Sequence, residues 1–531
     1  MSSSGSAAAP APAGAFAPFA YPAFALLWIA TLVSNTGTWM HEVGAGWLMT
    51  TLNPSPAVVT LVQAATTLPV FLFALFAGAL ADRLDKRRML IVINLALTAV
   101  VSLLAVLVWL EAVTPLLLIL FTLMIGTGAA FMAPAWQAVV PHLVPRPVLK
   151  PAIALNSMGI NISRAIGPAL AGLLIATVGL AAPFALNAAS HVVIVAALLL
   201  WRPPPAPERT RHGSLLGDMA TGLRHVRHNA AMRATALRAA LFFLFASAYW
   251  ALLPLIARGA EGGGSELYGL LMAMIGTGAV TGALILPRLQ RRFDLNALVR
   301  LGTIGTALAL ASMAASSAPA ALIGAALLGG LSWIAVLTAF NVSAQTALPD
   351  WVRARGLAVF LMVFFGSMAL GSIVWGQVAT FLSTSAALLI AAFGLGAGVL
   401  LAGGIRVGQG EGRDLTPSGL WPEPPLVEAA TAHRAALVVI EYQVAADQSA
   451  AFAAAARRFA GERYRDGATR WSLHESVETP GTWLESFELP SWAEHVEQHA
   501  RVTRDDADAQ EVLRAFDTRP DGPTVRHFLA A

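Results

Sequence analysis

Apolar stretches of about 20 residues recur between residues 24 and 405, and they limit the fold more than any other feature of the chain. A stretch of this length crosses the core of a bilayer. The stretches are apolar all round, whereas helices of a soluble core keep a polar face. We therefore predict an all-α membrane protein of about twelve transmembrane helices. The predicted spans are residues 24–50, 57–80, 89–110, 115–139, 152–178, 181–201, 238–257, 266–287, 296–317, 319–342, 356–381 and 384–405.

The composition agrees with a membrane protein. Of the 531 residues, 57% are hydrophobic and 12% are charged, whereas a soluble protein carries about 25% charged residues. The predicted partner of most of the surface is therefore the lipid bilayer. The chain has no cysteine, which excludes disulfides, zinc–thiolate sites and thiol nucleophiles. Its arginines lie in short segments between apolar spans, so we predict no nucleic-acid partner.

Lysine and arginine are concentrated in every second loop, and this bias sets the orientation of a membrane protein. We therefore predict a protein of the bacterial inner (cytoplasmic) membrane, with the even-numbered loops and both termini in the cytoplasm. The odd-numbered loops are nearly free of basic residues, and Arg258 is the clear exception. The basic residues of the even-numbered loops are Arg83, Lys86, Arg87, Arg88, Arg146, Lys150, Arg202, Arg209, Arg211, Arg224, Arg227, Arg233, Arg288, Arg291, Arg292, Arg353 and Arg355.

The two halves of the membrane part repeat each other at a nearly constant offset. Three pairs of segments match in order: residues 78–88 with 282–292, 137–144 with 345–352, and 167–172 with 371–376. Two parallel six-helix halves are typical of a rocking transporter that binds substrate between them near mid-membrane. A channel is not supported, because the sequence shows no filter-like loop.

The segment Gly78-Ala79-Leu80-Ala81-Asp82-Arg83-Leu84-Asp85-Lys86-Arg87-Arg88 resembles the loop motif of the major facilitator superfamily, except at Asp85, where glycine is usual. Residues 134–172 and 341–376, with Trp39, resemble the enterobactin-exporter-like branch of drug and siderophore efflux proteins. The resemblance covers residues 20–408. It implies the major facilitator fold and export of a small organic molecule by proton antiport and alternating access, with the proton gradient as energy source and no cofactor.

The resemblance also implies roles for two motifs. The first is the gating motif, which is matched by Gly78, Asp82, Arg83, Arg87 and Arg88. Its acid pairs with a neighbouring span in one conformation only. The alternative is simple positive-inside topology, which explains the arginines but not the aspartate. In a second motif, Gly167, Pro168 and Gly172 resemble the antiporter motif of the fifth span. There we predict a hinge, and ordinary packing of small residues is the alternative.

Charged residues inside spans are costly and therefore indicate function. Glu42 lies in the first span and Arg164 in the fifth. An apolar surrounding favours the neutral form of a carboxyl, so such a group can take up and release a proton. We predict Glu42 as the proton carrier and Arg164 as its partner; the alternative is a solvated, inert Glu42 near the periplasmic mouth.

Polar and aromatic side chains within the spans are candidates for the substrate cavity. Each amide could equally form a hydrogen bond between helices, and tryptophan is more often an interfacial anchor. The candidates are Trp39, Asn35, Gln137, Asn341 and Gln345.

Composition changes abruptly after Ile405, and a soluble strand–helix–strand–strand–helix–strand pattern follows, which predicts a small α+β ferredoxin-like domain. It resembles the antibiotic-biosynthesis-monooxygenase type, which allows dimerisation. We assign no catalytic residue and no metal site, and interpret His474, His495 and His499 as surface histidines rather than reactive groups.

The predicted segments are an N-terminal disordered tail (1–22), the first six-helix half (23–201), a cytoplasmic linker (202–237), the second half (238–406), a linker (407–430) and the soluble domain (431–531).

The leading prediction is therefore a secondary exporter that is not an enzyme. Two alternatives stay open: an importer or permease of the same fold, and a bifunctional transporter whose C-terminal domain is an oxygenase-like enzyme or a sensor.

Overall fold

The computed structural model describes residues 14–202, 215–418, 427–428 and 431–531, without the side chain of Asp82 and a few others. Most of the predicted N-terminal tail and the stretch 203–214 of the predicted linker lie outside the described residues. The chain forms two compact units. The membrane unit comprises Met1–His212, Ala240–Thr338 and Leu361–Gly403, and the C-terminal unit comprises Gly213–Ala239, Ala339–Phe360 and Gly404–Ala531.

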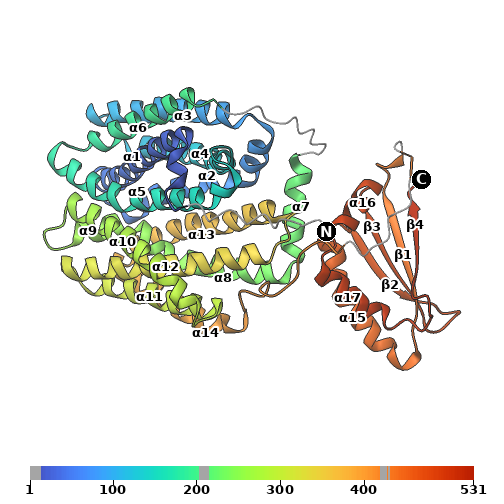
Figure 1. Cartoon of the computed structure of the whole chain (residues 1–531). Coiled ribbons are helices and arrows are strands. Elements are labelled where there is room, and N and C mark those ends of the chain that lie inside the picture. The colour runs from blue at the N-terminus through green and yellow to red at the C-terminus, as the bar shows by residue number, and fades with distance from the viewer. Residues whose placement is uncertain (1–13, 203–214, 419–426, 429–430) are drawn as a thin grey trace, which may run out of the picture. The chain divides into compact units, whose positions relative to one another are not determined.

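Twelve helices of the described residues are long and apolar enough to cross a membrane, which confirms the predicted number of spans. One of the twelve, Ala230–Gly259, is made of the consecutive helices α8 and α9. The helices of the spans, labelled in Figure 1, are α1 (Pro22–Leu52), α2 (Pro56–Arg83), α3 (Lys86–Trp109), α4 (Pro115–Val139), α5 (Leu149–Thr177), α6 (Ala181–Leu200), α8 (Ala230–Ala251), α9 (Leu253–Gly259), α10 (Ser265–Gln290), α11 (Leu295–Ala315), α12 (Pro319–Thr346), α13 (Arg353–Phe381) and α14 (Thr384–Leu401).

Matching residues begin matching helices in the two halves. The Asp85 carboxylate accepts a hydrogen bond of 2.7 Å from the backbone N–H of Arg88 and caps the start of α3. Asp294 caps α11 in the same way through Ala297, also at 2.7 Å. Aspartate is among the best residues at this position because its carboxylate satisfies an otherwise unpaired N–H. The departure from glycine at Asp85 thus has a structural reason, and the second half repeats it.

The predicted linker 202–237 contains a helix, α7 (Leu215–His228), which belongs to the C-terminal unit. Within that unit, the His228 ring stacks on Tyr464 with centroids 5.1 Å apart. Arg224 forms an ion pair of 3.4 Å with Glu494. The Arg501 guanidinium lies 4.7 Å from the centroid of the Trp351 ring. Contacts of the soluble domain therefore extend to α7 and to the loop between α12 and α13.

The soluble domain has the predicted ferredoxin-like order. Its elements are β1 (Ala436–Gln443), α15 (Ser449–Arg465), β2 (Arg470–Glu475), β3 (Thr482–Leu489), α16 (Trp492–Arg501), α17 (Arg504–Arg514) and β4 (Thr524–Leu529). The antiparallel sheet has the order β2-β3-β1-β4, and Figure 1 shows the helices on one face of it. On β1, Val438, Ile440 and Tyr442 alternate with less buried residues and form the core together with Phe452 of α15.

A buried charge pair lies in the core of this domain. The Arg463 and Glu485 side chains are 2% and 1% exposed, and their Nε and Oε1 atoms are 3.0 Å apart. The carboxylate also accepts hydrogen bonds from the Tyr442 hydroxyl and from the Trp471 indole N–H, each of 3.0 Å. Burial alone would favour the neutral acid, but Arg463 and these donors outweigh it and hold the pKa of Glu485 below its usual value.

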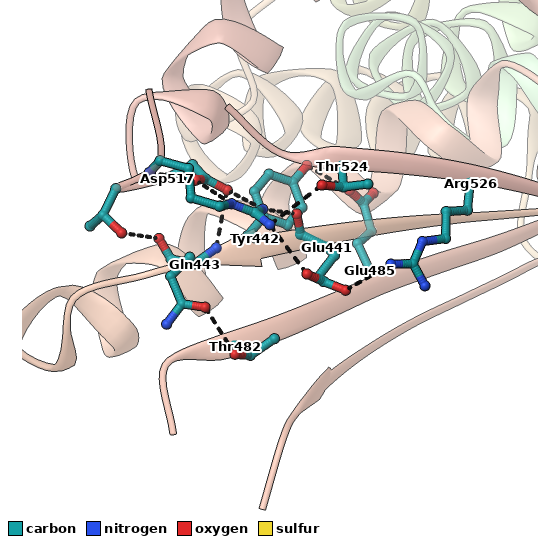
Figure 2. Close-up of polar contacts among 10 residues, drawn as sticks. Glu441, Tyr442, Gln443, Thr482, Glu485, Asp517, Thr524 and Arg526 are labelled. Carbon is teal, nitrogen blue, oxygen red and sulfur yellow. Dashed lines mark hydrogen bonds and ion pairs between the residues drawn. The ribbon is translucent and has the colours of Figure 1, made fainter. Parts of the chain in front are cut away.

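A second polar network lies at the end of β1. Figure 2 shows Gln443 between Asp517 and Thr482, which come from different parts of the domain. The backbone N–H of Gln443 donates to Asp517 at 3.0 Å, and its side-chain oxygen accepts from the Thr482 hydroxyl at 2.9 Å. Glu441 pairs with Arg526 of β4 at 3.8 Å. These contacts fix the edge strand β4 and the turn before it on the central strand.

Candidate functional site

The junction of α1, α5 and α10 brings charged and polar groups together inside the membrane unit. Glu42 of α1 is half-buried and lies within electrostatic range of Arg164 on α5 and of the buried Tyr268 on α10. The Arg164 guanidinium lies over the Trp39 ring, 5.3 Å from its centroid, which is a cation–π distance. Among the described atoms, Arg164 Nε is buried without a hydrogen-bond partner.

Glu42 and Arg164, which the sequence analysis paired, both lie at this junction, and their role in proton coupling stays a prediction. The sequence did not single out Tyr268, which belongs to the second half of the chain. Its ring also stacks near Trp47, with centroids 6.3 Å apart. The one feature of the sequence that could have drawn attention to Tyr268 is that the chain has only 5 tyrosines.

Glycines allow α5 and α10 to approach closely at this junction. A Cβ built on Gly172 would lie 2.6 Å from the carbonyl oxygen of Ser265, and one on Gly269 would lie 2.5 Å from that of Pro168. A Cβ on Gly276 would lie 2.9 Å from the carbonyl oxygen of Arg164. Side chains larger than hydrogen would force the helices apart. The two halves therefore meet backbone to backbone along the stretch that carries Arg164.

The predicted hinge residues lie within this contact. α5 continues through Pro168 to Thr177. A Cβ on Gly167 would lie 2.7 Å from Trp39 Cβ and 2.9 Å from the carbonyl oxygen of Thr36, so Gly167 faces α1 while Gly172 faces α10. The motif thus fits α5 between two helices, and its role as a hinge stays a prediction.

The second half repeats this contact with exchanged partners. Gly371 of α13 faces Leu244 and Ser247 of α8, and Gly376 faces Thr60 of α2. The pairs α5–α10 and α13–α2 are therefore equivalent crossings between the halves, as expected for the sequence repeat.

Further contacts between the halves lie at the span ends away from the basic loops, here called the opposite end. Arg258 donates to the carbonyl oxygen of Thr50 at 2.5 Å and to its hydroxyl at 3.1 Å. The backbone N–H of Ala57 donates to the Thr380 hydroxyl at 3.0 Å. These bonds, together with the two glycine crossings, join the halves at the opposite end. Arg258, the exception to the charge pattern, is part of this closure.

The gating-motif residues have different surroundings. Arg87 donates to the carbonyl oxygens of Leu198 and Leu199, at 2.7 and 2.9 Å, and so binds the end of α6. Arg83 and Arg88 are exposed, and a Cβ on Gly78 would have no neighbour within 4 Å. The Asp82 side chain lies outside the described part of the chain, so its pairing as a latch stays a prediction.

The predicted cavity residues divide between the two units. Trp39 and Asn35 are half-buried in the membrane unit, where Gln137 is exposed. Asn341 is half-buried and Gln345 exposed in the C-terminal unit. Of the five, Trp39 belongs to the cluster around Arg164; a cavity role for the set stays a prediction.

A comparison with family models decides the class of protein. The model of the family described as transmembrane secretion effector, within the major facilitator superfamily, matches residues 13–531. The chain belongs to this family. The match runs to the last residue and so includes the soluble domain, whereas the sequence motifs ended near residue 408.

Curated relatives of the chain include a staphyloferrin A transporter and enterobactin exporters. The staphyloferrin A transporter of Staphylococcus aureus (strain NCTC 8325 / PS 47) is 25% identical over 65% of this chain and 88% of that protein. The enterobactin exporter EntS of Shigella boydii serotype 4 (strain Sb227) is 26% identical over 71% of this chain and 89% of that protein. The secretion effector described here is thus a multi-pass membrane transporter of small molecules.

Solved structures agree on the fold. The nucleoside transporter NupG superposes with a TM-score of 0.62 at 14% identity, over 72% of this chain and 99% of that one. A POT family transporter in complex with 5-aminolevulinic acid gives 0.61 at 12% identity, over 74% and 98%. At such identities the likeness shows the major facilitator fold and nothing about the cargo.

Proposed function

We propose that this secretion effector exports a small organic molecule of the siderophore kind across a bacterial inner membrane by proton antiport, with both termini in the cytoplasm. The observation that carries the proposal is the cluster of Glu42, Arg164 and Tyr268 at the junction of the two halves. Charges inside a membrane are costly and persist where they serve transport. The names of the two curated relatives support the cargo class.

Glu42 is the proton carrier in this proposal. When ionised, it interacts with Arg164 across α1 and α5; when protonated, it no longer balances the arginine. The α5 segment that carries Arg164 also lies against α10, where the halves meet. Proton uptake at Glu42 therefore changes the electrostatic balance at the surface that must separate for the transporter to open toward the opposite side.

The same contacts support alternating access. With both termini in the cytoplasm, the opposite end is the periplasmic one, and in this proposal the joined halves close the transporter there. Export requires the glycine crossings and the Arg258–Thr50 bonds to open while the basic end closes. An importer would use the same two conformations, and the exporter EntS among the relatives favours outward transport.

The test is proton-coupled transport by the purified full chain in liposomes. Enterobactin and staphyloferrin A are the first cargo probes, followed by compounds to which a deletion strain becomes sensitive. A proton gradient is imposed, and the internal pH and the cargo are measured together. The wild-type protein should move cargo and protons in opposite directions, whereas Glu42→Gln should lose gradient-driven transport by at least tenfold and keep cargo exchange without a gradient.

Glu111→Gln is the matched control, because Glu111 is an exposed loop residue and its change should leave coupling intact. Gradient-driven transport that survives in Glu42→Gln would contradict the role of Glu42. Cargo movement in the same direction as the protons would instead contradict antiport and favour the importer.

A further inference from the structure

Three histidines of the soluble domain converge on one point. His495 and His499 lie one turn apart on α16, and His527 lies on β4. One ring nitrogen of each lies within 4.8 Å of those of the other two. His527 is the register partner of Val438, which faces the helices. Cross-strand partners share a face of the sheet, so His527 also faces α16.

The spacing of these nitrogens fits a metal ion. His495 Nε2 and His499 Nε2 are 3.3 Å apart. Zinc binds imidazole nitrogen at about 2.0–2.1 Å with tetrahedral angles, which separates two ligand nitrogens by about 3.3 Å. The His527 nitrogen lies within 4.8 Å of the other two and would have to approach to about 3.3 Å to complete a three-histidine face.

A buried amide orients the first histidine. His495 Nδ1 lies 3.3 Å from Gln498 Oε1, and both residues are 1% exposed. The amide oxygen accepts, so Nδ1 carries the proton, and the Nε2 lone pair faces His499 Nε2, which donates to it. A zinc ion bound there would take the place of that proton. Metal-binding histidines characteristically donate their second N–H to an oxygen in this way.

Neutral imidazole is the form that binds metal, and the surroundings favour it at His495 and His527. Burial, with a smaller effect of His499 and His527, lowers the pKa of His495 to about 4. Burial also lowers the pKa of His527. The Trp492 ring lies 5.1 Å from the His495 ring and 5.6 Å from the His527 ring, so an aromatic wall limits the access of water on that side.

We propose that His495, His499 and His527 form a zinc site in the C-terminal domain, with the fourth position open to water or a small anion. Three imidazoles with an open position suit Zn²⁺ in the absence of thiolates. The metal would join α16 to the edge strand β4. Because α16 also carries Glu494 and Arg501, which contact α7 and Trp351, the site would hold the helix that makes those contacts.

The interpretation of His495 and His499 as surface histidines did not reveal this site. For His495 that interpretation is wrong, because the residue is 1% exposed and packs against Gln498. The spacing His495-x-x-x-His499 places both rings on one helix face and was an available signal. The third ligand follows only from the pairing of β4 with β1, which is a long-range contact.

The experiment uses the full chain in detergent, purified through a tag without histidine. Zinc content is measured first, and affinity is then determined by competition with a fluorescent zinc chelator. The wild-type protein should hold one Zn²⁺ per chain, and X-ray absorption at the zinc edge should show three imidazole nitrogens at about 2.0 Å. His527→Gln and His499→Gln should each weaken binding at least 100-fold. Gln498→Leu should weaken it by about 10- to 100-fold, because it removes only the orienting acceptor.

His474→Gln is the matched control, because His474 is an exposed histidine of β2 in the same domain. Hydrogen exchange of β1 in each variant confirms that the domain remains folded. Zinc binding equal to wild type in both His527→Gln and His499→Gln would overturn the proposal. Absorption data with fewer than three imidazole nitrogens would overturn it as well. Neither result depends on transport, so failure here is separate from failure of the proposed export function.

Discussion

Charged side chains are treated differently in the spans and in the soluble domain. In the membrane unit, Glu42 and Arg164 interact through space at a junction whose shape is set by glycines. In the soluble domain, Arg463 and Glu485 are in direct contact inside an aromatic core, with additional donors on the carboxylate. In the proposed transport cycle the pairing of Glu42 and Arg164 changes when the helices move. The Arg463–Glu485 pair, by contrast, cannot separate without leaving a buried charge unpaired.

This contrast has a physical basis in what each region must do. A fully satisfied buried pair specifies one structure, and loss of one partner is strongly destabilising. A transporter needs two conformations of similar free energy, so its central charges must not fix one of them. Contacts between glycine backbones suit that need, because they can separate without leaving large apolar side chains exposed.

The largest effect is expected when the buried pair is broken. Arg463→Met leaves the Glu485 carboxylate buried without its cation and should lower the stability of the soluble domain by about 3–5 kcal/mol. Hydrogen exchange of β1 and β3 in the full chain measures this loss, as amides that exchange about 100-fold faster or more. The double variant with Glu485→Gln should lose less, because the amide oxygen still accepts from Tyr442 and Trp471.

The pair Arg470–Glu488 provides the control, since both groups are exposed and 3.7 Å apart, and Arg470→Met should cost about 0–1 kcal/mol. The pH dependence has a definite sign. The pKa of Glu485 is lowered in the folded domain, so its contribution is present above the unfolded carboxyl pKa and is lost as the pH falls through the folded value. Equal losses in Arg463→Met and Arg470→Met would contradict the contrast.

The next effect concerns the glycine crossing. Gly172→Leu should disfavour the conformation closed at the opposite end by about 1–3 kcal/mol, which is a 5- to 150-fold loss in population. Because the chain has no cysteine, a single Thr60→Cys near the second crossing reports this state. Its labelling by an impermeant maleimide should rise when Gly172→Leu is added.

Gly324→Leu is the control, because a Cβ on Gly324 would have no neighbour within 4 Å, and labelling should stay at its original level. Unchanged labelling in Gly172→Leu would mean that the crossing does not control closure.

The features predicted from sequence are those that depend on local pattern. The spans follow from apolar length, and the order of strands and helices in the soluble domain follows from alternation and turn residues. Glu42 and Arg164 were paired because both are charges inside spans, and their coupling stays a prediction. Tyr268 and His527 were missed because their positions depend on contacts between distant segments, which no local pattern encodes.

Asp85 is an intermediate case, because the pattern flagged it and the structure explains it. The family motif has glycine where this chain has an aspartate that caps α3, and Asp294 repeats the cap in the second half. Sequence comparison alone presents Asp85 as a departure that puts the turn in doubt. Its φ of −62° shows that the turn does not require glycine.

The smallest effect is expected at this cap. Asp85→Ala should cost about 1 kcal/mol at the start of α3, whereas Asp85→Gly, which restores the usual family residue, should cost only a few tenths. Hydrogen exchange of the first turn of α3 distinguishes the two. If the Asp85 carboxylate instead pairs with another span, the latch role predicted for Asp82, alanine and glycine remove the same group and should impair transport equally. The defect would then bear no relation to the stability of the helix start. Measuring hydrogen exchange and transport in both variants therefore distinguishes a helix cap from a latch. A transport defect as large in Asp85→Gly as in Asp85→Ala would count against capping as the main role of Asp85.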